Sequence, residues 1–521
     1  MKKTELSRRH LLQLAAAGSG TALLGFPTLA CASGSKAVRH AKNIIFMVSD
    51  GMPISVPTMV DHYQQLTTGK GSYWMWLMDQ PWVRNALQDT RSLNSVVTDS
   101  SSAASTWGSG RWIWNGQLNC YPDGTKLRTL YSLLQEQGMR TGLVTTTTMT
   151  HATPSGFVIV NESRDDEAGI ARQHLDGGVD VLMGGGNRFF GGDARADKKD
   201  LYGLFAVKRY EIARDLASMN NAGTTGKLLG IFSNSHLPYT VDRVNNPELN
   251  KGVPTLAQMT KKAIDMLKGS SEGFILQVEG GRVDHGNHAS DLPASLFDQI
   301  EFEEAMKVAV DFARIDKDTL VIITADHACG GTALNGAGDE YIDSTAGLRT
   351  VENMKCSYTN MLAELRLDPK PDTIIGKVKD KLGIELKKDE AEAISAAIAG
   401  NSPFKTLNFL ANPSQTFGAI MGNHTKVTYT SGNHTNDHVL LTALGPGSER
   451  IAGLVQNTSL FDLMLEARGL RHSNPKMDFE TAKRFYDAKA KTAAKVRTEP
   501  EAEHDDELLM AHASLARIGS V

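Results

Sequence analysis

The sequence predicts an α/β fold, in which a mostly parallel central sheet carries helices on both faces. Short runs of apolar and β-branched residues recur along the chain, each followed by glycine or polar residues, and stretches with helical spacing lie between several of them. Runs that are apolar throughout, without alternation, are typical of parallel strands covered on both sides. Ligands of such sheets bind beyond the carboxyl ends of the strands, so functional residues are expected there.

The predicted elements follow this rhythm in chain order. Strands are predicted at 43–48, 96–98, 141–145, 179–183, 274–278 and 319–324, where apolar and β-branched residues are consecutive. Helices are predicted at 256–267 and 302–313, where apolar residues recur every three or four positions. The alternation predicts one large α/β domain at residues 37–470.

Two regions depart from the alternation of strands and helices. Residues 335–425 contain short helical patterns at 359–365, 372–382 and 389–399, which predicts a mostly helical cap inserted into the core. Residues 471–521 have little apolar content and an acidic run near their end, which predicts a peripheral tail.

Residues 1–32 have the pattern of an export signal. Arg8 and Arg9 precede two leucines and an apolar stretch that is short and broken by Pro27, so a membrane anchor is excluded. Paired arginines in this position are typical of the twin-arginine machinery, which exports folded proteins, and predict a periplasmic or secreted protein whose mature form has no transmembrane span. Lipid attachment at Cys31 is a lesser alternative, because Thr28 stands where lipoprotein signals usually have leucine.

Composition excludes two classes of protein. A net charge of −4 and a pI near 6.4 do not fit a nucleic-acid-binding surface, which needs clustered lysine and arginine. Four cysteines in 521 residues cannot form a disulfide scaffold, so a large apolar core must stabilise the fold.

Acidic and histidine side chains gather after the predicted strands. The residues of the metal-ligand type are Asp50, Glu279, Asp284, His288, Asp326 and His327. At one edge of a sheet, unpaired carboxylates would repel one another by several kcal/mol at an effective dielectric constant near ~20, and cations would relieve that repulsion. Mixed carboxylate and imidazole ligands suit zinc, whereas oxygen ligands alone suit magnesium.

A serine run follows the predicted strand 96–98 and opens a predicted helix. A hydroxyl there would lie against backbone N–H groups at the positive end of the helix, which suits a nucleophile that must hold a phosphate group. By chemistry alone Ser100, Ser101 and Ser102 are all candidates.

These segments, in this order from about residue 43 to 470, resemble the alkaline phosphatase family of phosphomonoesterases, which bind two zinc ions and one magnesium ion. The resemblance implies an alkaline-phosphatase-like fold. It also implies three sets of metal ligands: Asp284, His288 and His434 for one zinc, Asp50, Asp326 and His327 for the other, and Asp50, Thr153 and Glu279 for magnesium. Arg164 stands where the family grips two phosphate oxygens, a task that suits a planar guanidinium.

The family register resolves two ambiguities. The spacing from Asp99 to the following tryptophan and glycine matches the family without a gap and makes Ser100 the nucleophile, whereas Ser102 would require a two-residue slip. The tetrapeptide Gly-Asn-His-Thr occurs twice, and the family spacing selects His434 as the ligand and leaves His424 to the edge of the cap.

Three positions vary within the family. His151 and His285 stand next to the magnesium and the phosphate, where other members carry acidic or lysine side chains; Asp99 and His151 are expected behind the ligands, and His285 against the substrate. An imidazole there removes a permanent charge and can itself bind a metal. Cys329 stands near a zinc ligand, and we interpret it as a buried thiol in preference to a contact of the metal.

The resemblance implies hydrolysis of small phosphate monoesters through a phosphoserine on Ser100, with activity that rises above neutral pH, by a protein that family analogy expects to be a homodimer. A phosphodiesterase of the same superfamily and a non-catalytic phosphate-binding relative are the alternatives. A sulfatase is disfavoured, because no Cys-x-Pro-x-Arg or Ser-x-Pro-x-Arg run is present.

Overall fold

The structure is a computed structural model that describes residues 40–404 and 406–496. The chain divides into two compact units, Met1–Val38 and Arg39–Val521, and all described residues belong to the second. The predicted export signal and Cys31 lie outside the described residues.

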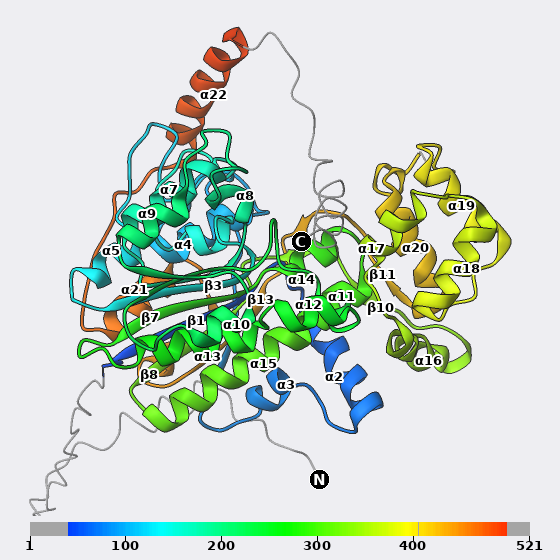
Figure 1. Cartoon of the computed structure of the whole chain (residues 1–521), viewed down its shortest axis with the longest axis horizontal. Coiled ribbons are helices and arrows are strands. Elements are labelled where there is room, and N and C mark those ends of the chain that lie inside the picture. The colour runs from blue at the N-terminus through cyan, green and yellow to red at the C-terminus, as the bar shows by residue number, and fades with distance from the viewer. Residues whose placement is uncertain (1–39, 405, 497–521) are drawn as a thin grey trace, which may run out of the picture. The chain divides into compact units, whose positions relative to one another are not determined.

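A ten-stranded sheet forms the centre of the unit, in the order β14-β2-β13-β8-β1-β7-β3-β4-β6-β5 (Figure 1). Its strands are β1 (Asn43–Ser49), β2 (Arg84–Gln88), β3 (Arg140–Thr148), β4 (Val181–Gly185), β5 (Tyr210–Ala213), β6 (Lys227–Ile231), β7 (Phe274–Gly280), β8 (Thr319–Thr324), β13 (Val439–Leu444) and β14 (Leu454–Val455). From β8 to β5 all neighbours are parallel, and β13 runs antiparallel to both β8 and β2. The predicted mostly parallel sheet is confirmed.

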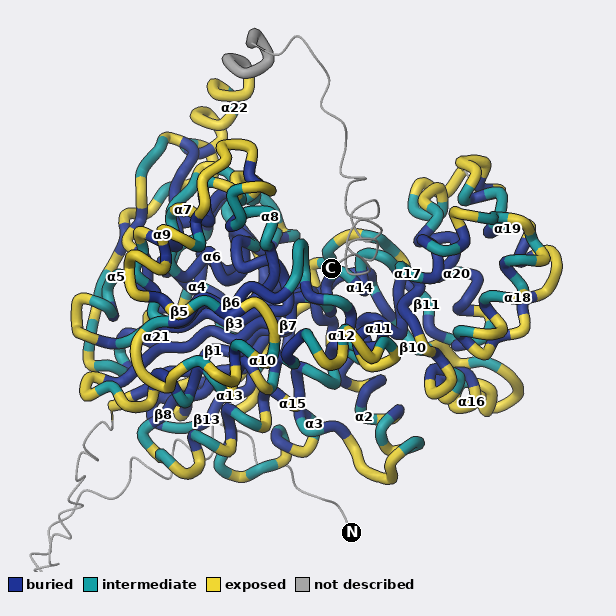
Figure 2. The backbone as a smooth tube through the Cα atoms, viewed as in Figure 1, coloured by how far each residue is buried: buried dark blue, intermediate teal, exposed yellow. Residues whose placement is uncertain are grey.

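Helices cover both faces of this sheet, as predicted. Successive residues of a strand point to opposite sides of the sheet, and both sides of the buried strand β1 pack against helices. Ile45 and Met47 belong to one apolar cluster with residues of α13 (Leu256–Leu267) and α15 (Leu292–Asp316). Ile44 and Phe46 belong to a second cluster with residues of α4 (Ser100–Ser109), α7 (Glu167–Gly177) and α21 (Ser459–Ala467). Figure 2 shows the buried strands in dark blue and many exposed residues on the outlying helices in yellow.

Further short elements complete this core. The helices are α2 (Ser55–Thr68), α3 (Tyr73–Met78), α5 (Leu130–Gln135), α6 (Ala152–Ser155), α8 (Asn187–Phe190), α9 (Leu201–Val207), α10 (Leu216–Asn221), α11 (Thr240–Val244), α12 (Pro247–Gly252), α14 (Arg282–His288) and, at the C-terminal side, α22 (Phe479–Val496). Two small strands, β9 (Ala328–Cys329) and β12 (His434–Thr435), pair antiparallel. Among the described residues, no helix is both long enough and apolar enough to cross a membrane.

The three central strands end together. In the registers of β1 with its two neighbours, Val48 lies opposite Glu279 of β7 and Thr324 of β8. The residues that follow these positions therefore emerge at the same edge of the sheet, and these include Asp50, Asp284 and Asp326.

Residues 335–425 leave and return to the core at one place, where β10 (Ala333–Leu334) pairs antiparallel with β11 (Val427–Thr428). The helices between these strands are α16 (Asp343–Arg349), α17 (Tyr358–Leu365), α18 (Pro371–Leu382), α19 (Lys388–Ile398) and α20 (Pro413–Thr425). Figure 1 shows α18 and α19 in yellow, packed together. The helical patterns at 359–365, 372–382 and 389–399 correspond to α17, α18 and α19.

One predicted strand is wrong. Residues 96–98 form an irregular segment that leads into α4, and the side chain of Val96 is 68% exposed. Three β-branched residues are too few to define a strand, and Asn115 holds the segment by donating to the Val97 carbonyl oxygen at 3.0 Å. Conversely, five strands of the central sheet were not predicted, namely β2, β5, β6, β13 and β14. The strand β2 is polar, β5, β6 and β14 are short, and the buried apolar run of β13 was overlooked.

Candidate active site and metal centre

The candidate nucleophile lies at the first turn of α4. The Asp99 side chain caps this helix by accepting from the Ser102 N–H at 2.8 Å, which leaves Ser100 as the first helical residue. The Ser101 hydroxyl donates to Asp99 Oδ2 at 2.6 Å, and that of Ser102 donates to the Ile113 carbonyl oxygen at 2.7 Å. Only the Ser100 hydroxyl of these three reaches the histidine cluster, 3.2 Å from His327 Nε2.

The first candidate metal group joins Asp284 and His288 of α14 to His434 of β12. His288 Nε2 lies 3.3 Å from Asp284 Oδ2 and 3.0 Å from His434 Nε2. The Nδ1 atoms of His288 and His434 lie 2.6 Å from the Gly432 carbonyl oxygen and 2.8 Å from the Thr98 carbonyl oxygen. A carbonyl oxygen can only accept, so Nδ1 is the protonated nitrogen of each ring and Nε2 is left to face the group.

Burial favours ligand-ready forms of these groups. It lowers the pKa of His434 to about 4, with His327 nearby adding to the shift, so this imidazole is neutral at pH 7. Burial opposes the ionisation of Asp284, but His288 and His434 hold its pKa well below the usual range. A neutral imidazole and an ionised carboxylate are the forms that bind metal.

The second group contains Asp50, Asp326 and His327, all buried. His327 Nε2 lies 3.1 Å from Asp326 Oδ2 and 3.6 Å from Asp50 Oδ1. Asp326 Oδ1 accepts from the backbone N–H groups of Gly51 and His327, each at 2.9 Å, which orients its other oxygen toward the group.

The third group surrounds the second carboxylate oxygen of Asp50. The Thr153 hydroxyl donates to Asp50 Oδ2 at 3.2 Å, and His151 Nδ1 lies 3.6 Å from Glu279 Oε1. Thr145 was not predicted to take part, but its hydroxyl donates to Glu279 Oε2 at 2.5 Å. The sequence feature that could have indicated Thr145 is a run of threonines at the end of β3, where the chain reaches the carboxyl edge of the sheet.

The donor atoms of these groups fit cations. Four buried carboxylate oxygens have no hydrogen-bond partner, namely Asp50 Oδ1, Glu279 Oε1, Asp284 Oδ1 and Asp326 Oδ2. Burial of an unpartnered acceptor is costly, and that of an ionised one more so. Burial, followed by repulsion from Asp326, Asp284 and Glu279, also raises the pKa of Asp50 well above its usual value. Three sets of donor atoms are compact enough for a metal ion: Asp284, His288, Cys329 and His434; Asp50, Asp284 and His327; and Asp50, His151 and Glu279. The second of these sets contains Asp284 where the predicted set has Asp326, whose Oδ2 atom lies 3.1 Å from His327 Nε2.

Arg164 lies beside the nucleophile. Its Nη1 atom donates to Asp99 Oδ2 at 3.3 Å, and its Nη2 atom lies 3.2 Å from His151 Nε2. Burial opposes ionisation of Asp99, but Arg164 and the Ser101 hydroxyl lower its pKa. Asp99 is therefore an ionised partner that aims the guanidinium, as the expected position behind the ligands implies.

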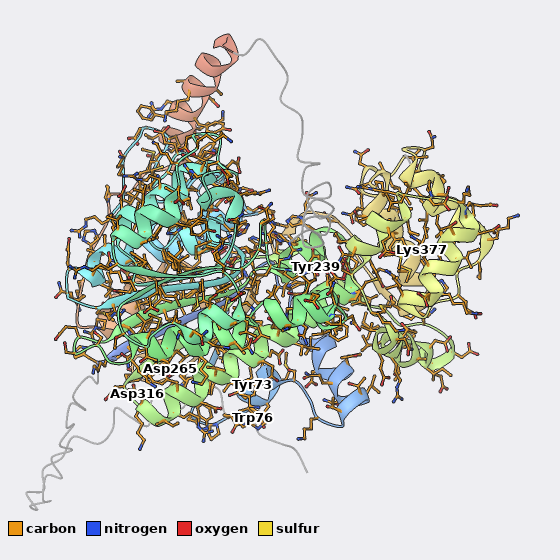
Figure 3. The ribbon with its side chains drawn as sticks, in the orientation of Figure 1. Tyr73, Trp76, Tyr239, Asp265, Asp316 and Lys377 are labelled. Atoms are coloured by element: carbon orange, nitrogen blue, oxygen red, sulfur yellow. The ribbon has the colours of Figure 1, made fainter. Side chains whose placement is uncertain are left out.

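His285 lies in a group of basic side chains that also contains His236, which was not predicted from the sequence. Its ring centroid lies 5.7 Å from that of His151 and 4.4 Å from that of His236. His285 Nδ1 lies 2.5 Å from Arg282 Nη1, and the Arg282 guanidinium carbon lies 3.8 Å from the ring centroid of Tyr239, which Figure 3 labels. His236 comes from the loop after β6, a strand that was not predicted.

His424 and Cys329, the remaining positions singled out in the sequence, lie in different parts of the structure. His424 lies in α20, where its Nε2 atom is 3.0 Å from Glu390 Oε2 of α19, so it fastens two helices of the insertion. Cys329 lies directly opposite His434 in the β9–β12 pair and joins the first metal group. Burial, followed by the charge of Asp284, raises the pKa of the Cys329 thiol well above its usual value. The described cysteines are free thiols.

Comparisons with known proteins agree with this geometry. A family model described as alkaline phosphatase matches residues 41–470. Alkaline phosphatase 3 of Bacillus subtilis is 29% identical over 431 residues, which are 80% of this chain and 87% of that protein. Alkaline phosphatase of Escherichia coli is 30% identical over 360 residues, 60% of this chain and 76% of that protein. The crystal structure of Thermus thermophilus alkaline phosphatase has a TM-score of 0.82 and 34% identity, and the match covers 90% of this chain and 100% of that chain.

Proposed function

Because the chain belongs to the alkaline phosphatase family, a family of metal-dependent hydrolases, we propose that it hydrolyses phosphate monoesters to an alcohol and inorganic phosphate with Ser100 as the nucleophile. One observation carries the assignment of the nucleophile: the Ser100 hydroxyl, alone among three adjacent serines, meets the carboxylate and histidine groups. In this scheme Ser100 Oγ attacks phosphorus, the alcohol leaves with a proton, and water then cleaves the phosphoserine to restore the hydroxyl and release phosphate.

The residues around Ser100 would bind and orient the phosphate. The guanidinium of Arg164 has two donors near the start of α4, where backbone N–H groups also favour an anion. Asp99 holds Arg164 from behind, and His285 would contact a further phosphate oxygen from α14. The helices of the insertion 335–425 are proposed as a cap that lines the substrate pocket.

We propose zinc for the two groups that mix imidazole and carboxylate ligands, which are Asp284, His288 and His434 in one and Asp50, Asp326 and His327 in the other. Magnesium is proposed for the oxygen donors of Asp50, Thr153 and Glu279. When bound, these ions would lower the pKa of the hydroxyl and of the attacking water and neutralise the carboxylates. His151 Nδ1 lies 3.6 Å from Glu279 Oε1, so zinc is the competing ion at the third group.

The expected result with purified protein is rapid hydrolysis of p-nitrophenyl phosphate, a rate that rises above neutral pH, and much slower hydrolysis of bis(p-nitrophenyl) phosphate. Initial rates on the two compounds, measured beside the zinc and magnesium content, check this. A faster rate on the diester would identify a phosphodiesterase of the same superfamily. Phosphate binding without turnover by fully metallated protein would identify a non-catalytic relative.

We also propose that the twin-arginine machinery exports the protein to the periplasm or beyond and that it assembles as a homodimer, with lipid attachment at Cys31 as the lesser alternative. Paired arginines before an apolar stretch support the export route. Replacing Arg8 and Arg9 with lysine is expected to leave active, metal-bound enzyme in the cytoplasm, as fractionation and phosphatase assays would show. An inactive cytoplasmic precursor with normal metal content would contradict folding before export.

A further inference from the structure

The segment that follows the family match is fixed to the core by one buried side chain. Asn474 is 4% exposed, and its amide group donates to the Ser109 carbonyl oxygen at 2.8 Å and to the Arg128 carbonyl oxygen at 2.9 Å. Its side-chain oxygen accepts from the Arg128 N–H at 2.8 Å. The amide of Asn474 is therefore held by the core, five residues before α22 begins, and Asp478 caps that helix by accepting from the Thr481 N–H at 2.8 Å. Figure 1 shows α22 in red.

The helix α22 then lies against the loops on either side of the candidate phosphate site. Tyr486 stacks on Trp114, with ring centroids 4.6 Å apart and an interplanar angle of 24°. Phe479 adds a second, more distant stack on the same ring, at 6.2 Å. Lys489 Nζ lies 2.9 Å from Glu162 Oε2, two residues before Arg164. Trp114 is only 8% exposed, and the aromatic contacts of α22 contribute to its burial.

The two residues after Trp114 hold the groups that aim Arg164. The Asn115 side chain accepts from the Asp99 N–H at 3.2 Å. The Gly116 N–H donates to Asp99 Oδ2 at 2.9 Å, and the Gly116 carbonyl oxygen accepts from the Arg164 N–H at 2.8 Å. A shift of the Trp114 ring would therefore be passed through two peptide bonds to Gly116, and from there to the Asp99 carboxylate and to the backbone of Arg164.

We propose that α22 is a positioning element for phosphate binding, which acts through the Tyr486–Trp114 stack and the loop 114–116 on Asp99 and Arg164. This inference rests on the proposed role of Arg164 as the phosphate-binding residue. It assigns a catalytic consequence to residues beyond 470, where the match to the family model ends.

The direct test is Tyr486→Ala in the full chain, a change at a half-exposed side chain that removes the stack. We expect the KM for p-nitrophenyl phosphate and the inhibition constant of inorganic phosphate to rise together by about twofold to tenfold, the range that aromatic pairs contribute. The kcat is expected to stay within about twofold and the metal content to stay unchanged, because no group in contact with the reacting atoms is removed. Tyr486→Phe keeps the ring and is expected to restore the wild-type KM.

A pair of shortened chains makes the same test without a substitution. A chain that ends after Asp478 keeps Asn474 and loses α22, and is expected to behave like Tyr486→Ala. A chain that ends after Val496 keeps α22 and serves as the matched control with wild-type KM. A melting temperature that falls while KM is unchanged would show a merely structural helix and overturn the proposal.

A double-mutant cycle separates this inference from the proposed function. In an Arg164→Ala background, Tyr486→Ala is expected to add almost nothing to the rise in KM, because the side chain that the helix positions is gone. An equal rise in both backgrounds would overturn the proposed path through Arg164. If Arg164→Ala alone leaves KM and phosphate inhibition unchanged, the role of Arg164 in the proposed function fails first.

Discussion

Ser100→Ala is expected to lower the turnover of p-nitrophenyl phosphate by about a thousandfold or more, while the protein keeps its metal content and its fold. The reason is that no neighbouring hydroxyl can take over: that of Ser101 donates to Asp99, and that of Ser102 donates to the Ile113 carbonyl oxygen. The kcat of the purified variant and the melting temperature give the measurement. Acid quenching during turnover should trap phosphate on the wild-type chain and none on the variant.

Ser102→Ala is the matched control. Its hydroxyl lies within the same helix turn, and its loss removes one buried hydrogen bond, which contributes about 1 kcal/mol to the free energy of unfolding. We expect turnover within about threefold of wild type, since the hydroxyl at Ser100 remains. Near-normal turnover by Ser100→Ala, or collapse of turnover in Ser102→Ala alone, would refute the assignment of the nucleophile.

Asp50→Asn is expected to have the next largest effect, because Asp50 belongs to two of the three candidate metal groups. Its Oδ1 atom lies 3.6 Å from His327 Nε2, and its Oδ2 atom accepts from the Thr153 hydroxyl at 3.2 Å. Substitution should therefore lower the content of two metal ions and reduce kcat by about a hundredfold or more. Elemental analysis beside kcat measures this, and His288→Ala should lower only one ion.

His424 of the insertion 335–425 provides a control for unspecific loss of metal. His424 lies in the first copy of the tetrapeptide Gly-Asn-His-Thr and His434 in the second. Because His424 pairs with Glu390, His424→Ala should retain the wild-type metal content. Equal loss of metal in the variants of His424 and Asp50 would contradict the assignment, and so would loss of a single ion from Asp50→Asn.

Asp50→Asn is also expected to change the stability of the fold, in opposite directions with and without metal. Burial, then repulsion from Asp326, Asp284 and Glu279, raises the folded-state pKa of Asp50 above its unfolded value of 3.8, so ionisation of Asp50 destabilises the metal-free fold as pH rises through that interval. After chelation above neutral pH, Asp50→Asn should unfold at a higher temperature than wild type, and with metals bound at a lower one. Calorimetry of wild type and Asp50→Asn, with and without metals, measures these unfolding temperatures. If the variant unfolds at the lower temperature in both conditions, repulsion at Asp50 is unimportant.

Local patterns in the sequence were sufficient for the centre of the fold. The consecutive apolar residues of β1, β7 and β8 identify strands buried on both faces, and parallel pairing brings their carboxyl ends to one edge. The acids that follow each strand were therefore expected to meet. The structure brings Asp50 and Glu279 into one compact group and places Asp326 Oδ2 3.1 Å from His327 of the adjoining group. Strands β2, β5, β6 and β14 escaped prediction because they are polar or short and are defined by their neighbours in the sheet, whereas the buried apolar run of β13 was overlooked.

The sequence by itself determined the kinds of side chain that reach the carboxyl edge, because strand ends and helix starts are set by residues close together in the chain. The family register selected Ser100 among three serines and His434 between two identical tetrapeptides, and tertiary structure supplies the contacts that distinguish them: Ser100 faces His327, Ser102 donates to the Ile113 carbonyl oxygen, and His424 pairs with Glu390. Tertiary structure also placed His236 beside His285 and α22 against Trp114. Each of these outcomes depends on hydrogen bonds and ring contacts between residues far apart in sequence, and such contacts leave no periodic trace in the chain.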